Sequence, residues 1–162
     1  MNSETLKKKV FAIKNTTLQT ALRLQMITGM RISEIGQLEN KDIKLEDNTI
    51  IIDCKAKKGS FDRTIIIKEP EKWLYNSLLE IKENRPGQLF YKASTLKKYA
   101  CKRGIKTNDL KKLRAKELFY KAERAGLSKH QSTKYVQGHL GHKRIKNTKI
   151  YIESKSLEIV RD

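Results

Sequence analysis

The chain has 162 residues, of which 38% are hydrophobic, so it suits one domain of ordinary size with a core of its own. Lys and Arg number 36 against 18 Asp and Glu, which gives a formal net charge of +18. This charge favours binding to a polyanion, and nucleic acid is the leading candidate. The alternative is a basic surface that is solvated and binds no partner. No stretch approaches the ~20 apolar residues of a membrane helix, and the first residues lack the apolar core of a signal peptide. The two cysteines have no CxxC spacing. We therefore expect a reduced, cytoplasmic protein without a membrane partner.

The first half of the chain predicts two helices followed by a small sheet. Apolar periodicity from Leu18 predicts a helix that starts at Thr16 or Thr17 and ends at Gly29. A short helix over 33–38 should follow, capped by its serine or by the turn before it. Two β-branched runs, 49–53 and 63–67, flank a turn over 57–60 and predict an antiparallel hairpin, or three strands if Ile43 joins it.

The second half predicts helices only. Pro70 suits the first turn of a helix that runs to about Asn84, and its apolar face is expected in the core, with Trp73, Leu74, Leu78 and Ile81. Further helices are predicted over 94–103, 109–125 and 128–137, and a short one should hold Tyr151. The expected caps are Asn108 and Ser128, and the expected stops are Gly104 and Gly126. The fold class is therefore α+β, mainly α-helical, with one small antiparallel sheet.

Tyr151 follows His142 by nine residues, and this pair suggests phosphate chemistry. A tyrosine phenol can attack a phosphodiester and hold the phosphate covalently, but its pKa near 10 means that it must first lose a proton. The transition state places negative charge on the non-bridging oxygens, which guanidinium groups match as planar forks. A lysine can protonate the leaving 5′-oxygen, and a histidine can support the phosphate. Arg31, taken alone, would be read as a surface residue paired with Glu34.

Three segments, in their order along the chain, resemble the boxes of the tyrosine recombinases, the phage integrase family. The first is TGMRISEI over residues 28–35, and the second is the predicted hairpin with Lys57, Lys58, Gly59 and Arg63. The third is LGH over 140–142, followed by NTKIY over 147–151. The resemblance implies the tyrosine-recombinase catalytic-domain fold and site-specific DNA recombination.

The resemblance assigns a role to each matching position. Arg31 would be the first arginine of the phosphate clamp, His142 the late histidine that supports the phosphate, and Tyr151 the nucleophile. Lys58 would be the lysine general acid of the hairpin, with Lys57 as a close rival and Lys55 nearby.

The middle box departs from the family pattern, which is commonly His-x-x-Arg. In one register, Asn108 and Lys111 replace the histidine and the arginine; in the other, Lys111 and Arg114 form Lys-x-x-Arg. We favour the second register because it keeps a guanidinium, which lysine does not mimic as a two-pronged donor. It also resembles integrases of archaeal viruses and plasmids. The alternative is that both side chains only line a solvated or DNA-backbone face.

Neither a metal nor a cofactor is implied. His139 and His142 lie three residues apart, but no recognised spacing supplies further zinc ligands. The implied reaction is a metal-free transesterification through a 3′-phosphotyrosyl link, as in the integration of viral DNA. Four protomers would carry out this reaction on double-stranded DNA, and the protein would be a monomer in solution. The alternatives are relaxation by a type IB topoisomerase, and a non-catalytic DNA-binding protein with the same fold.

The resemblance also bears on domain organisation. Family members usually carry a separate N-terminal domain that binds the other face of the DNA, and the chain before Leu18 has no room for one. We expect residues 1–162 to be a single catalytic domain, whose tail over 152–162 could dock on a neighbouring protomer.

Overall fold

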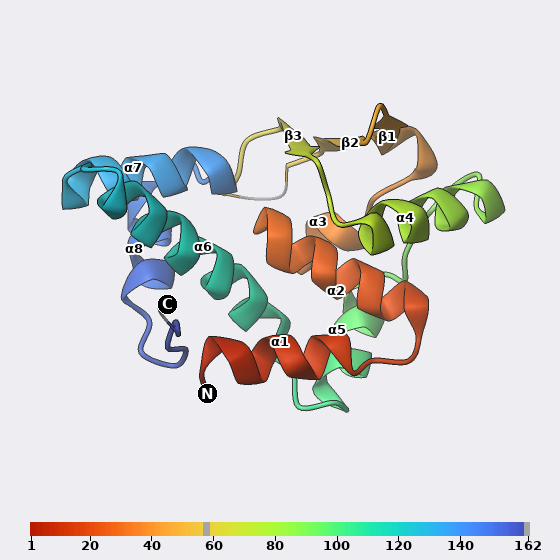
Figure 1. Ribbon diagram of the computed structural model, residues 1–162, viewed down its shortest axis with the longest axis horizontal. Helices are drawn as coiled ribbons and strands as arrows, with labels where there is room; N and C mark the ends of the chain where they lie inside the picture. The colour runs from red at the N-terminus through yellow and green to blue at the C-terminus, as the bar shows by residue number, and fades with distance from the viewer. Residues whose placement is uncertain (57–58, 161–162) are drawn as a thin grey trace.

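The computed structural model describes residues 1–56 and 59–160. A mainly helical body carries one small sheet at its edge (Figure 1). The elements in chain order are α1 (Ser3–Phe11), α2 (Thr16–Thr28), α3 (Ile32–Gly36), the 3₁₀ helix η1 (Asn40–Asp42), β1 (Ile43–Glu46), β2 (Thr49–Cys54), β3 (Arg63–Lys68), α4 (Lys72–Asn84), α5 (Ala93–Cys101), α6 (Thr107–Arg124), α7 (Lys129–Leu140) and α8 (Ile145–Glu153). The predicted fold class is confirmed.

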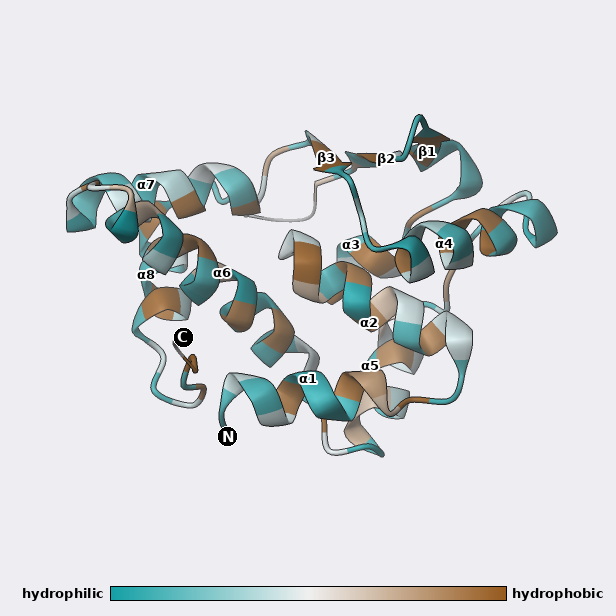
Figure 2. Cartoon of the chain, in the orientation of Figure 1, coloured by the Kyte–Doolittle hydropathy of each residue, from teal (hydrophilic) through white to brown (hydrophobic). Residues whose placement is uncertain are grey.

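The sheet is antiparallel with the strand order β1-β2-β3, and Ile43 does join it, opposite Ile52. Alternate residues of β2 face the helices, so Ile50 and Ile52 are fully buried. In Figure 2 brown and teal bands alternate along the helices, as expected where one side of each helix packs inward.

Helix α2 forms the centre of the core and packs against α1, α3, α4 and α6. Leu18 and Leu22 are fully buried, and Gly29 ends the helix in the left-handed conformation at φ +72°, as its position predicts. A second cluster joins α6 to α7 through Ala115, Val136 and neighbouring side chains, and Tyr151 packs against it. That cluster fixes the position of α8 and therefore of the tyrosine.

Three expectations are corrected, and one helix was not expected. Pro70 precedes Glu71, the cap of α4, and so lies outside the first turn of that helix. Residues 3–11 form a helix that the sequence did not predict, with Asn2 accepting a hydrogen bond from the Thr5 amide at 2.9 Å. Trp73 is 37% exposed instead of buried, and its ring lies against the Arg23 guanidinium at 4.4 Å. Asn108 lies inside the first turn of α6 and does not cap it, since the cap position is Lys106.

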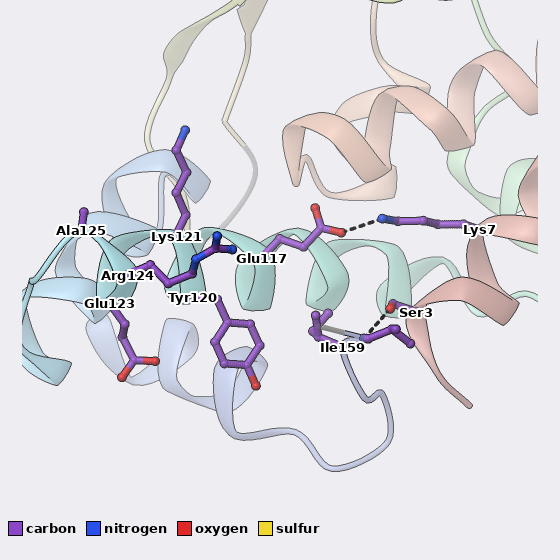
Figure 3. A pocket seen from close by; sticks show the side chains of 10 residues that line it. Ser3, Lys7, Glu117, Tyr120, Lys121, Glu123, Arg124, Ala125 and Ile159 are labelled. Atoms are coloured by element: carbon purple, nitrogen blue, oxygen red, sulfur yellow. Dashed lines mark hydrogen bonds and ion pairs between the residues drawn. The ribbon is translucent and has the colours of Figure 1, made fainter. Parts of the chain in front are cut away.

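The C-terminal segment folds back onto α1 of the same chain. Glu158 exchanges backbone hydrogen bonds with Met1 and Ser3, and the Val160 amide donates to the Ser3 hydroxyl at 2.8 Å (Figure 3). Leu157 is 1% exposed and belongs to the core. The pocket in this region is lined by both signs of charge, including the Lys7–Glu117 ion pair, so it favours no single class of ligand. Over the described ranges, no helix has the length and apolar character needed to cross a membrane.

Candidate functional site

The loop before β3 is tied to the turn between α7 and α8. The Phe61 amide donates to the Gly141 carbonyl at 2.7 Å, and the Lys143 amide donates to the Gly59 carbonyl at 3.0 Å. Ser60 and His142 pair as an isolated antiparallel bridge. These bonds hold the second and third sequence boxes against each other.

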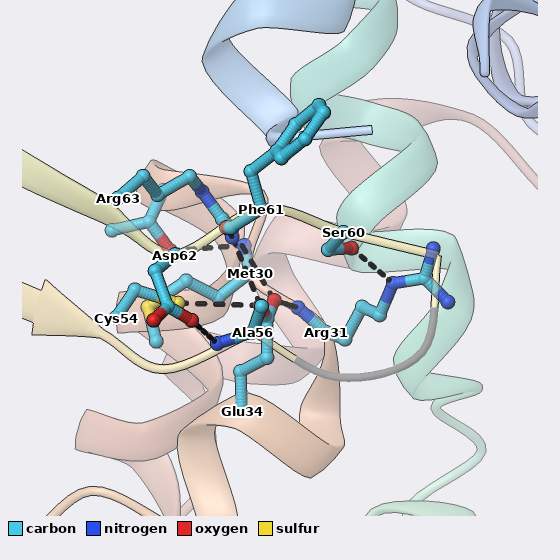
Figure 4. Close-up of polar contacts among 10 residues, drawn as sticks. Met30, Arg31, Glu34, Cys54, Ala56, Ser60, Phe61, Asp62 and Arg63 are labelled. Atoms are coloured by element: carbon cyan, nitrogen blue, oxygen red, sulfur yellow. Dashed lines mark hydrogen bonds and ion pairs between the residues drawn. The ribbon is translucent and has the colours of Figure 1, made fainter. Parts of the chain in front are cut away.

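A buried ion pair joins the first box to the hairpin. The Glu34 carboxylate accepts from the Arg63 guanidinium at 2.9 and 3.2 Å, and the Cys54 thiol donates to it at 3.2 Å (Figure 4). Burial alone would raise the pKa of Glu34, but the hydrogen bond and charge of Arg63 outweigh it and leave the pKa lowered. Burial and the neighbouring Glu34 raise the pKa of Cys54 to about 12, so its thiol stays protonated.

Arg31 stands at the N-terminus of α3, where the left-handed Gly29 turns the chain away from α2. Its backbone amide donates to Glu34 Oε1 at 2.7 Å, so this carboxylate also fixes the start of the helix. Its Nε donates to the Ser60 hydroxyl at 3.1 Å. The guanidinium therefore bridges from the first box towards the loop before β3, as Figure 4 shows.

His142 is buried at 1% exposure, and its Nδ1 lies 2.9 Å from the Thr148 hydroxyl. Burial lowers the pKa of its imidazole to about 3, with Lys111, Arg31 and Arg63 adding to the effect, so the ring is neutral at physiological pH. Nε2 has no hydrogen-bond partner in residues 1–56 or 59–160. A buried nitrogen of this kind has unused capacity for a bound group.

Tyr151 stacks on His142, with ring centroids 5.5 Å apart and planes 30° apart. Its hydroxyl donates to Asn108 Oδ1 at 3.0 Å. Burial raises the pKa of the phenol, and the charge of Arg31 opposes that rise. The tyrosine is thus held in one orientation in its protonated form, next to a guanidinium.

Lys111 lies beside the same tyrosine, with its Nζ 5.3 Å from the centre of the ring. The side chain is 1% exposed, and Nζ has no hydrogen-bond partner among the residues described. Burial lowers its pKa to about 7, and the charge of Arg31 contributes. The Lys111 amine is therefore buried and lacks a hydrogen-bond acceptor among the described residues.

Arg114 faces a different pocket from the one beside Tyr151. It lines a hollow with Thr28, Arg63 and His139, whereas Arg31 and Tyr151 line a pocket of about 230 Å³ with Asn108 and Lys97. Burial lowers the pKa of Arg114, and Arg114 in turn is among the causes that lower the pKa of His139. Asn108 and Lys111 thus lie beside the tyrosine, whereas Arg114 lines the neighbouring hollow.

Asn108 is the residue that sequence reasoning undervalued. The sequence favours Asn108 as a helix cap. Its position in place of the family histidine, in the first register, is the signal that points to a role in the site. Lys57 and Lys58 lie outside the described residues, so the prediction of a hairpin lysine stays a prediction. Among the residues that are described, no group of three or more His, Cys, Asp and Glu side chains could hold a metal ion.

The phage integrase family model matches residues 3–158. The chain belongs to the phage integrase family. That match spans all three boxes and the helices between them. No curated protein matches the chain.

Solved structures of site-specific recombinases share the fold of this phage integrase domain. The XerH recombinase bound to its difH substrate, in a pre-cleavage complex, is 20% identical with a TM-score of 0.67 over 96% of this chain and 51% of its own. The XerA recombinase is 18% identical with a TM-score of 0.69 over 96% and 60%. A lambda integrase dimer bound to a COC′ core site is 18% identical with a TM-score of 0.64 over 100% and 62%. The chain thus spans between half and two thirds of the length of these proteins.

Proposed function

We propose that this domain breaks and rejoins DNA strands by transesterification, with Tyr151 as the nucleophile, in site-specific recombination. The observation that carries the proposal is the gathering of Arg31, Lys111 and His142 around one tyrosine. The net charge of +18 supports double-stranded DNA as the substrate, through contacts with the backbone.

The proposed reaction keeps the number of phosphoester bonds constant. The Tyr151 oxygen attacks phosphorus, the phenol proton passes to water, and the bond from phosphorus to the 5′-oxygen breaks. The leaving 5′-oxygen takes up a proton from the hairpin lysine, Lys58 in our assignment, so the products are a 3′-phosphotyrosyl link and a 5′-hydroxyl. A 5′-hydroxyl of a partner strand then attacks the link and restores the phenol. We further propose that four copies of the whole protein carry out this exchange on DNA.

Each named side chain has a physical task in this step. Arg31 offers a planar fork to the non-bridging oxygens. The unpaired Nε2 of the neutral His142 donates to the phosphate if Nδ1 accepts from Thr148, which fixes the ring tautomer. Asn108 orients the Tyr151 hydroxyl but has no basic group with which to remove its proton. Arg114 is then a residue of the neighbouring hollow or of the DNA-backbone surface.

A nicked suicide substrate tests the proposal. The protein is incubated with nicked duplex DNA in EDTA and resolved by denaturing electrophoresis, because release of a short 5′-hydroxyl strand traps the covalent link. We expect an adduct that is lost in Tyr151→Phe and kept in Tyr99→Phe, a tyrosine whose ring packs edge-on against Tyr91 away from the site. Absence of an adduct for the wild-type protein under all conditions would contradict the proposal for this domain.

Relaxation and recombination share this covalent step, so a second assay separates them. Supercoiled DNA with one site reports relaxation, and DNA with two sites reports exchange. We expect exchange products from the whole protein. Relaxation alone would support the topoisomerase-like alternative. DNA binding without any adduct would favour the non-catalytic alternative, to which the replacement of the usual His-x-x-Arg by Asn108 and Lys111 gives some ground.

A further inference from the structure

Lys111 is a buried lysine whose amine has no hydrogen-bond partner among the described residues. It lies in the second turn of α6, is 1% exposed, and points its Nζ over the Tyr151 ring at 5.3 Å. Nζ has no hydrogen-bond acceptor within the described part of the chain. Burial of an ammonium group without an acceptor or counter-ion is costly, and a lysine so placed tends to lose its proton.

The groups that face Lys111 favour the neutral amine. Arg31 and Arg63 bring positive charge to it from the start of α3 and from β3, while His142 and Tyr151 are uncharged. Glu34 is the carboxylate that favours the ammonium, but it already accepts from Arg63, from the Cys54 thiol and from the Arg31 amide. A pKa of about 7 agrees with this balance.

We propose that anion binding at this site is coupled to uptake of one proton by Lys111. In the empty site the amine loses its proton at a lower pH than an ordinary lysine; when a phosphate group enters, an unprotonated amine takes a proton from the solvent, and the resulting ammonium donates to an anionic oxygen. The anion supplies both the counter-charge and the acceptor that the empty site lacks. This inference rests on the proposed phosphate site and adds the condition under which that site is charged.

The coupling lets the site gain its full positive charge only when an anionic ligand binds. A permanent ammonium on Lys111 would be repelled by the guanidinium groups of Arg31 and Arg63. A neutral lysine relieves that repulsion until the phosphate arrives. The same feature predicts that binding weakens as pH rises, because the proton must be taken from a more dilute source.

Sulfate is the probe that tests this coupling, because its charge does not change near neutral pH, whereas that of inorganic phosphate does. Protein with ¹³C-labelled lysine reports the protonation of each amine by NMR, and the Lys111 signal is assigned by its loss in Lys111→Arg. We expect one lysine to titrate near neutrality in the empty site and several pH units lower than the rest. Saturating sulfate should raise its midpoint by at least about one unit.

The sulfate affinity then gives the proton stoichiometry. Above the midpoint of the empty site, the dissociation constant should rise about tenfold for each unit of pH. Lys111→Arg keeps a permanent charge, so it should bind sulfate with little dependence on pH. Lys112→Arg is the matched control one position along α6, because Lys112 already pairs with Asp109, and it should behave as wild type.

Three results would overturn the inference. These are a Lys111 signal that titrates with the other lysines, a pH dependence that survives in Lys111→Arg, and failure of sulfate to bind at all. The suicide-substrate assay depends on Tyr151 and is read separately. Proton-coupled binding without a covalent adduct would keep the inference and contradict the enzyme, whereas an adduct without the coupling would contradict the inference alone.

Discussion

The hydroxyl of Tyr151 donates to Oδ1 of Asn108 at 3.0 Å, and this bond joins the last box of the sequence to the middle one. The amide oxygen can accept the phenol's hydrogen bond but cannot take its proton, because an amide is not basic in this range of pH. Since burial also raises the pKa of the phenol, the site holds its nucleophile in place without activating it. The surrounding cations, Arg31 among them, must then lower the cost of losing that proton.

Substitution of Asn108 therefore tests orientation apart from activation. Asn108→Ala removes one hydrogen bond, worth about 1 kcal/mol, so we expect adduct formation with a suicide substrate to slow roughly 3- to 10-fold. Asn108→His adds a basic nitrogen at the same place and should speed adduct formation by about tenfold or more. Single-turnover rates measure both changes.

The control for these variants is Asn84→Ala, whose amide only donates to the Glu80 carbonyl on the exposed side of α4. It should leave the rate unchanged. Equal rates for wild type and Asn108→Ala would show that the hydrogen bond does not position the nucleophile.

Glu34→Gln is expected to destabilise the fold, because the Arg63 guanidinium would lose its counter-charge in a buried place. The side chains of Glu34 and Arg63 are 0% and 11% exposed, and breaking such a pair typically costs about 3 kcal/mol or more. Glu71→Gln is the matched control, since Glu71 pairs with Arg23 but is 63% exposed, and it should cost less than about 1 kcal/mol. Urea unfolding at pH 7 measures both.

The pH dependence of that contribution has a definite sign. The pKa of Glu34 is lower in the folded protein than its ordinary value of 4.5, so the folded state favours the carboxylate. The stabilisation is complete above that value and is lost as pH falls through the lower pKa of the folded state. The difference in unfolding free energy between wild type and Glu34→Gln should therefore shrink in acid, and a constant difference down to the lowest pH would contradict the ion-pair account.

The main elements could be predicted from sequence because their signals are local. The periodicity of α2, the β-branched runs of β2 and β3 and the glycine after α2 each arise from neighbouring residues. Helix α1 has a weak sequence signal, because Leu6 and Val10 are its buried apolar residues and lysines lie between them. The exposure of Trp73 could not be predicted from its neighbours in the sequence, because its ring contacts Arg23, a cation on another helix.

The site was partly predictable for the same physical reason. Spacing along the chain found Arg31, His142 and Tyr151, which the fold gathers. It favoured the Lys111/Arg114 register over Asn108/Lys111, but it could not tell which of these side chains lie beside the tyrosine, because residues three apart on a helix lie on similar faces. Packing decides their surroundings: Lys111 lies over the Tyr151 ring, whereas the Arg114 side chain runs past Gly29. The pairing of Glu34 with Arg63 could not be predicted from local spacing either, because 29 residues separate the two along the chain.

Gly141 is expected to resist substitution because it both turns the chain before His142 and touches Arg63. Its φ is +68°, and a Cβ there would lie 2.6 Å from Arg63 Cδ. Gly126 has φ +94° with nothing within 4 Å, so Gly126→Ala isolates the backbone strain, about 1 kcal/mol. We expect Gly141→Ala to cost roughly 1–3 kcal/mol more than that, from overpacking, by thermal or urea unfolding. Equal costs for the two variants would mean that Arg63 moves aside freely.

Lys111→Met should stabilise the folded protein while removing its anion site. The folded pKa of about 7 lies below the ordinary lysine value of about 10.4, so between these values the unfolded chain binds the extra proton. Wild-type stability must therefore rise with pH across that window, and the full penalty of the buried ammonium is present below pH 7. Methionine fits a similar volume without the charge, so we expect a gain of about 2–4 kcal/mol at pH 6 that fades towards pH 10. Urea unfolding of both proteins at four pH values gives the difference directly, and subtraction cancels the other lysines. A gain that stays constant with pH would show that Lys111 is charged in the empty site, and a loss of stability would show that it already has a partner there.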